Sequence, residues 1–143
     1  MASSEAHEDT TSRTSAVPDK VEVLALVEAA LSWNVDSPEL PAVKDALAMA
    51  QQFTDFGRVV ADDLEAQLRS LPADSELCIG ARATLGEASR RLYLRPLAQT
   101  AAPRSAARRA QNLARLVQAL NRTFGEVGRE QVRSRSVQAP QRE

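Results

Sequence analysis

The residue with the clearest capacity for covalent chemistry is Cys78, the one cysteine of the chain. A nucleophilic cysteine needs a base or an electropositive setting that favours the thiolate. Cys78 stands between apolar Leu77 and Ile79, and the one histidine, His7, lies far away in a polar N-terminal segment. The sequence therefore predicts a partly buried structural cysteine, no internal disulfide and no histidine-based metal site.

An acidic stretch, Asp-Asp-Leu-Glu-Ala, begins at Asp62 and bears a distant similarity to the motifs that hold magnesium in isoprenoid enzymes. Such motifs need carboxylates that converge, whereas adjacent Asp62 and Asp63 would diverge by ~100° around a helix axis. Arg58 precedes Asp62 by four residues and Arg69 follows Glu65 by four, the spacing of ordinary surface pairs. We interpret the stretch as a solvated helix face and predict no catalytic, cofactor-binding or metal-binding residues.

Four arginines recur every seven residues in the last third of the chain: Arg108, Arg115, Arg122 and Arg129. On a helix this spacing places them on one face, which makes them the candidate partner-binding residues. A basic stripe suits an acidic protein surface or a phosphate backbone, and it is also an ordinary solvated exterior. It lacks interleaved aromatic residues and a helix-turn-helix, and the pI is about 5.9. The solvated exterior is the simplest of these interpretations, and nucleic acid is less favoured than protein.

The elements that must carry these residues are four segments with apolar residues at helical spacing. Asp74 or Ser75 is a suitable N-cap for the third segment, and Pro103 suits the first turn of the fourth. Gly125 and Gly128 indicate the end of the fourth helix. The predicted helices are 19–33, 39 or 41 to 71, 74 or 75 to 95, and 103 to about 128.

The second segment has the most regular pattern, a seam of residues at alternating spacings of three and four. The small seam residues Ala50, Gly57 and Ala61 indicate that a neighbouring helix approaches closely, although Gly57 could also mark a bend. The seam consists of Leu40, Val43, Leu47, Ala50, Thr54, Gly57, Ala61, Leu64, Leu68 and Leu71. The residues that we expect to be buried together are Leu47, Phe53, Val60, Leu64, Leu85, Leu92, Leu113, Val117 and Leu120.

Four amphipathic helices joined by short connections predict an all-α fold, an antiparallel four-helix bundle. The expected divisions are a disordered N-terminal tail at 1–17, the bundle domain at 18–128 and a disordered basic tail at 129–143. Composition agrees with an all-α fold, because aromatic residues make up 3% of the chain and alanine and leucine are abundant.

The near-neutral net charge of −1 hides a division along the chain. Residues 1–80 hold 5 Lys and Arg against 15 Asp and Glu, while residues 81–143 hold 13 Arg against 4 Glu. The first residues are polar and contain no hydrophobic core of a secretory signal, and no stretch is apolar enough to cross a membrane. We therefore expect a cytoplasmic protein that does not associate with membranes.

Two stretches, 81–92 and 107–121, resemble a family of small, uncharacterised actinobacterial helical proteins associated with natural-product biosynthesis. The resemblance covers roughly residues 71–125. Its elements are the Leu71–Pro72 lead-in, the Gly-Glu-Ala step at Gly86, Glu87 and Ala88, the following Arg90, Arg91 and Leu92, and a last helix of Ala, Arg, Leu and Val. The resemblance implies a genomic setting, and it supplies no activity, cofactor or site residue.

These observations predict a non-catalytic helical interaction or accessory protein with a regulatory role, whose partner is a protein. The alternative is a nucleic-acid-associated regulator that uses the arginine-rich fourth helix. A third reading is an enzyme or small-molecule carrier with a pocket in the bundle core, although an alanine-rich core offers few polar groups to orient a ligand. No cofactor is expected, and the oligomeric state stays open.

Overall fold

The computed structural model describes residues 19–138, and every regular element in that range is a helix. The prediction of four helices is confirmed. The predicted tail at 1–17 lies outside the described residues. The helices are α2 (Lys20–Leu31), α3 (Val43–Leu68), α4 (Glu76–Arg91) and α5 (Pro103–Gln138).

Local chemistry explains where the helices begin. The Ser75 hydroxyl accepts a hydrogen bond from the Cys78 backbone N–H at 3.1 Å, so Ser75 is the N-cap of α4. Pro103 occupies the first position of α5, where its missing N–H costs no helical hydrogen bond. Both α3 and α4 are shorter than the sequence pattern predicts, because the pattern continues into the flanking turns.

The predicted disordered tail at 129–143 is wrong for residues 129–138, which continue α5 without a break. Neither Gly125 nor Gly128 has the positive φ that ends a helix. Contacts with the end of α3 explain the extension: Gln131 Nε2 donates to Ser70 Oγ at 2.6 Å, and Val127 is fully buried. Composition alone therefore underestimated the order of this segment.

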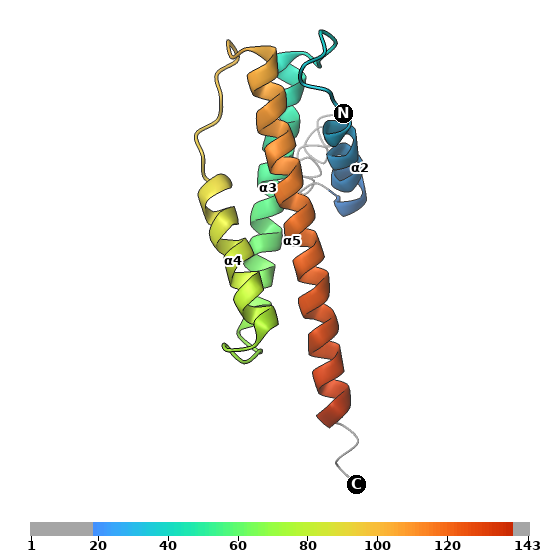
Figure 1. The fold of residues 1–143 in the computed structure, drawn as a ribbon, viewed down its shortest axis with the longest axis vertical. Coiled ribbons are helices and arrows are strands. Elements are labelled where there is room, and N and C mark those ends of the chain that lie inside the picture. Colours follow the sequence, from blue (N-terminus) through green and yellow to red (C-terminus); the bar gives the residue numbers. More distant parts are fainter. Residues whose placement is uncertain (1–18, 139–143) are drawn as a thin grey trace, which may run out of the picture.

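Helices α3 and α5 lie side by side, run in the same direction and share the largest interface (Figure 1). Consecutive helices run in opposite directions, since α2 and α4 both run against α3 and α5 (Figure 1). Helix α2 and helix α4 each pack against this central pair and do not touch one another. The apolar seam predicted for α3 therefore lies in a central pair of helices, α3 and α5, which α2 and α4 flank.

Most of the predicted core is buried. Gly57 provides the expected close approach, because a Cβ at this position would lie 2.8 Å from Leu92 Cδ2 and 3.8 Å from Leu120 Cδ1. Leu47 and Leu85 differ from the prediction, since both are partly buried. Seven predicted residues are buried: Phe53, Val60, Leu64, Leu92, Leu113, Val117 and Leu120.

Helices in the described range lack the combination of length and apolar character that a membrane crossing requires.

Candidate functional site

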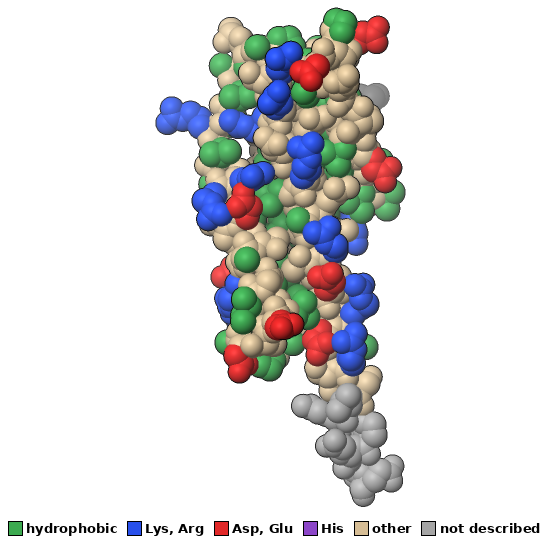
Figure 2. Space-filling model, in the orientation of Figure 1, with side chains coloured by type: hydrophobic (Ala, Val, Ile, Leu, Met, Phe, Trp, Pro, Cys, Tyr) green, Lys and Arg blue, Asp and Glu red, His purple; other side chains and the backbone are tan. Residues whose placement is uncertain are grey.

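Helix α5 positions all four candidate partner-binding arginines. Its apolar side, which includes Ala110, Val117 and Leu120, is buried against the other helices. The opposite side is exposed, and Figure 2 shows basic side chains, which on this helix are all arginine, spaced along its length. The arginine stripe consists of Arg108, Arg115, Arg122 and Arg129, each of them exposed.

The arginine stripe is most strongly cationic in its upper half. Within the part of the chain that the structure describes, none of its arginines lies within ion-pair distance of a carboxylate. Arg115 Nη1 donates to Asn112 Oδ1 at 3.2 Å, which orients one guanidinium and leaves its charge unbalanced. Lower down, the exposed Glu126 and the partly buried Glu130 lie on the same helix. Acidic side chains accordingly appear beside the lower part of α5 in Figure 2.

Among the described residues, the other side chains considered for chemistry do not form a cluster. Cys78 is fully buried, where the sequence predicted partial burial, and His7 lies outside the described residues. Asp62, Asp63 and Glu65 are exposed on α3. Among residues 19–138, no group of His, Cys, Asp and Glu side chains is arranged to hold a metal ion.

The predicted surface pair between Arg58 and Asp62 is wrong. The Arg58 guanidinium instead reaches across to the end of α4, where Nη2 donates to the Leu92 carbonyl at 2.7 Å and Nε donates at 3.1 Å. The same guanidinium stacks over the Tyr93 ring, 4.3 Å from its centroid. Arg58 therefore satisfies a C-terminal carbonyl of α4 that has no partner within its own helix.

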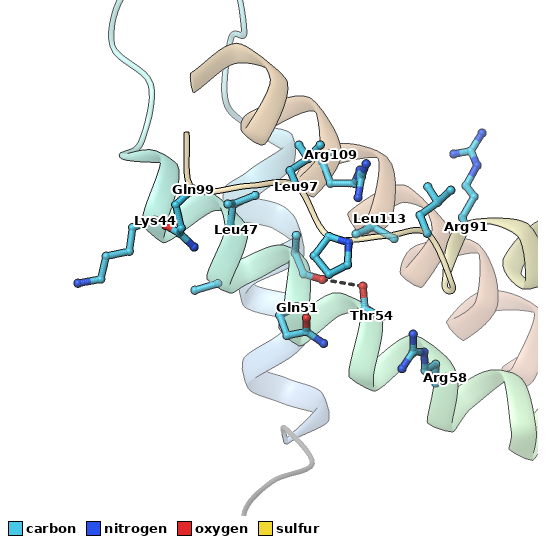
Figure 3. A pocket seen from close by; sticks show the side chains of 14 residues that line it. Lys44, Leu47, Gln51, Thr54, Arg58, Arg91, Leu97, Gln99, Arg109 and Leu113 are labelled. Carbon is cyan, nitrogen blue, oxygen red and sulfur yellow. Dashed lines mark hydrogen bonds between the residues drawn. The ribbon is translucent and has the colours of Figure 1, made fainter. Parts of the chain in front are cut away.

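A pocket of about 400 Å³ lies beside this contact, between α3, α5 and the connection from α4 to α5. We call it the α3–α5 pocket. It exists because α4, with 16 residues, covers part of the groove beside α3, which has 26. Beyond Leu92 an irregular segment covers the groove less completely. In Figure 3, Leu47, Leu97 and Leu113 lie around the pocket, with Lys44 and Gln99 at one end and Arg58 at the other.

Besides Arg58, two further arginines at this pocket have partners within the chain. Arg109 Nη1 donates to the Arg95 carbonyl at 3.0 Å and so fixes the connecting segment to α5. Arg91 Nε lies 2.6 Å from Glu87 Oε2. A hydrogen bond from Arg90 and the charge of Arg91 lower the pKa of Glu87 below its ordinary value.

Sequence reasoning missed the α3–α5 pocket, because its basic residues come from segments far apart in the chain. Lys44 and Arg58 lie on α3, and Arg109 lies on α5. One signal was available: the second predicted helix is much longer than the third, so part of its seam has no helix of matching length beside it. Leu47, a seam residue, is left partly exposed at this place for that reason.

Comparison with known proteins gives one result. The model of a family of unknown function, DUF6415, matches residues 21–129. No curated protein and no solved structure matches the chain. The match agrees with the resemblance to an uncharacterised family and extends it over α2 and α3.

Proposed function

The chain belongs to DUF6415, a family of unknown function, and from that premise we propose that it is a non-catalytic helical accessory protein that binds an acidic protein partner. The observation that carries this proposal is the exposed arginine stripe on α5, whose opposite side is buried in the domain. Arg108 and Arg129 are 21 residues apart, which corresponds to ~32 Å along a helix.

The chemistry of arginine supports a partner protein whose binding surface is rich in carboxylates. A guanidinium presents its donors in a planar fork that matches a carboxylate, and it stays charged at any physiological pH. An exposed ion pair contributes about 0–1 kcal/mol, so one arginine would bind weakly. Four such groups fixed on one rigid helix would add their contributions without a large loss of backbone entropy on binding.

The remaining parts of the proposal concern the setting. We take the four helices to act as a rigid scaffold of the antiparallel bundle type, in which α5 is held in place by α2, α3 and α4. We place the protein in the cytoplasm, with a regulatory role. An actinobacterial, natural-product setting is implied by the resemblance of 81–92 and 107–121.

Nucleic acid is the second candidate partner, because α5 continues as a helix that carries Arg133 and Arg135 beyond the arginine stripe. Glu126 and Glu130 on the same helix oppose a phosphate backbone. Each phosphate contact contributes about −0.9 to the log–log salt slope of duplex binding, so three lost contacts would flatten it by about 2.7. Saturable sub-micromolar binding to a duplex at ~150 mM salt would favour this candidate over a protein partner.

The triple variant Arg108→Gln, Arg115→Gln, Arg122→Gln tests the proposal. These side chains are exposed, so the variant should retain the helical circular dichroism and melting temperature of wild type. Tagged wild type and variant would be used to purify complexes from a host extract with and without nuclease. We expect a stoichiometric complex with wild type that survives nuclease and is lost with the variant. A complex that the variant retains would contradict the proposal.

A further inference from the structure

Basic residues surround the α3–α5 pocket, and among residues 19–138 no carboxylate lines it. Lys44, Arg58, Arg91 and Arg109 line it, together with neutral polar and apolar side chains. Glu87 neutralises Arg91, whereas Arg58 and Arg109 donate to the Leu92 and Arg95 carbonyls, which leaves their charges unbalanced. Lys44 and Arg109 have no carboxylate within ion-pair distance among residues 19–136. The pocket therefore presents an excess of positive charge.

Apolar and polar side chains share the lining of the pocket, and the apolar ones lie mainly on α3, α5 and the connecting segment. Leu113 is 4% exposed and Ala50 is 7% exposed, and the side chains of Leu47 and Leu97 lie beside them (Figure 3). Thr54 Oγ1 donates to the Ala50 carbonyl in its own helix, so this hydroxyl is directed to the backbone. A volume of about 400 Å³ lies within the range of small-molecule sites.

The pocket also has fixed walls. Arg58 fixes the end of α4, and Arg109 fixes the connecting segment through the Arg95 carbonyl. The bond to Arg95 uses one Nη1 donor, and a guanidinium has five N–H donors, so Arg109 retains donors for an anion. The partly buried position of Arg109 places this guanidinium where an anion in the pocket can reach it.

We propose that the α3–α5 pocket binds a small amphipathic carboxylate, with its apolar body between α3 and α5 and its anionic group at Arg109 or Lys44. The carboxylate supplies the negative charge that this pocket lacks, and the apolar body covers Leu47, Leu97 and Leu113. The site is separate from the arginine stripe, so the proposal does not depend on a protein partner.

Sodium decanoate is a suitable probe, with 1-decanol as the matched uncharged control. Titration would be followed in methyl NMR spectra of full-length protein labelled at leucine. We expect saturable shifts of the Leu47, Leu97 and Leu113 methyl signals, while those of Leu64, in the core near the far end of α3, stay in place. Equal affinities for decanoate and decanol would overturn the proposal, as would the absence of saturable shifts at millimolar decanoate.

Paired variants separate charge at the pocket from charge elsewhere. Lys44→Gln with Arg109→Gln should weaken decanoate binding about tenfold, since two exposed ion pairs together contribute about that factor. Arg108→Gln with Arg115→Gln removes the same charge from the neighbouring face of the molecule and should leave decanoate binding unchanged. Equal weakening by both pairs would overturn the proposal, because it would indicate attraction to the overall charge.

A third variant tests the location of the decanoate site without a change in charge. Thr54→Leu places a larger apolar side chain in the pocket, and leucine favours a helix at least as well as threonine. We expect unchanged circular dichroism and a loss of decanoate binding. A variant that folds normally and binds decanoate as wild type does would place the ligand elsewhere and overturn the proposal.

Discussion

The guanidinium of Arg58 on α3 holds the Leu92 carbonyl at the end of α4, with Nη2 at 2.7 Å and Nε at 3.1 Å from the oxygen. One turn of α3 thus determines where α4 stops, because Gly57 also accommodates the Leu92 side chain. Beyond this point an irregular segment replaces α4 beside α3, and the α3–α5 pocket begins. The same contact therefore stabilises the fold and sets one boundary of the pocket.

Arg58→Met should lower the free energy of unfolding by about 1–3 kcal/mol, because the variant leaves a carbonyl at the end of α4 without its charged donor. Methionine preserves length and helix propensity. Arg69→Met is the matched control, since Arg69 is exposed at the C-terminal end of the same helix, and it should change stability little. Urea denaturation measures both. Equal effects of the two changes would contradict the capping role of Arg58.

Gly57→Ala should lower the stability of the fold, whereas Gly80→Ala should raise it. At position 57 a Cβ would lie 2.8 Å from the buried Leu92 Cδ2, so overpacking of about 1–3 kcal/mol should exceed the gain of ~1 kcal/mol in helix propensity. At position 80 a Cβ would meet nothing within 4 Å, so the gain in propensity should raise the melting temperature. Thermal melts would show the contrast. A stabilised Gly57→Ala would mean that α4 does not pack as tightly as described.

Leu64→Ala should destabilise more than Val117→Ala. Leu64 and Val117 are both fully or almost fully buried, and removal of the larger side chain leaves the larger cavity. The expected loss for Leu64→Ala is ~2–5 kcal/mol, whereas Leu94→Ala should cost little because Leu94 is 52% exposed. Chemical denaturation compares the three variants. If Leu64→Ala were as stable as wild type, the burial of the α3 seam in the core would be contradicted.

Glu87 should make stability depend on pH in the acidic range. Arg90 and Arg91 lower the pKa of this carboxyl below 4.5, so the folded state favours its ionised form. The stabilisation is present above pH 4.5 and is lost as the pH falls through the lower folded-state pKa. Glu87→Gln should therefore lower the melting temperature at pH 7, with a smaller difference at pH 3. If the difference in melting temperature between wild type and Glu87→Gln were constant with pH, ionisation of Glu87 would not contribute to stability.

Periodicity was sufficient to predict four helices, because each helix buries one face and the apolar residues recur accordingly. It identified Gly57 as a contact position, and residue type narrowed the N-cap of α4 to Asp74 or Ser75, of which Ser75 is the cap. It did not predict the end of α5, which is held by Gln131 and Ser70, residues 61 positions apart. An isolated polar segment gives no sign of a partner so distant in the sequence.

The pairing of the helices was also beyond sequence reasoning. A seam shows which face of α3 is buried, but it does not name the helix that covers it. Gln111 illustrates the same limit: its buried side chain donates to the Ala30 and Trp33 carbonyls, both at 2.9 Å, and so caps α2 from α5. The arginine stripe was visible because one helix carries it, whereas the α3–α5 pocket needed three segments in space.

Site-specific photo-crosslinking tests the proposed function most directly. A photoreactive amino acid would replace exposed Asn112 beside the arginine stripe, or exposed Ala83 on α4 as the control. After irradiation in the native host, we predict one acidic protein joined at position 112, absent at position 83, and lost when Arg108, Arg115 and Arg122 are changed to glutamine. Crosslinks to nucleic acid, or equal crosslinking from both positions, would contradict the account.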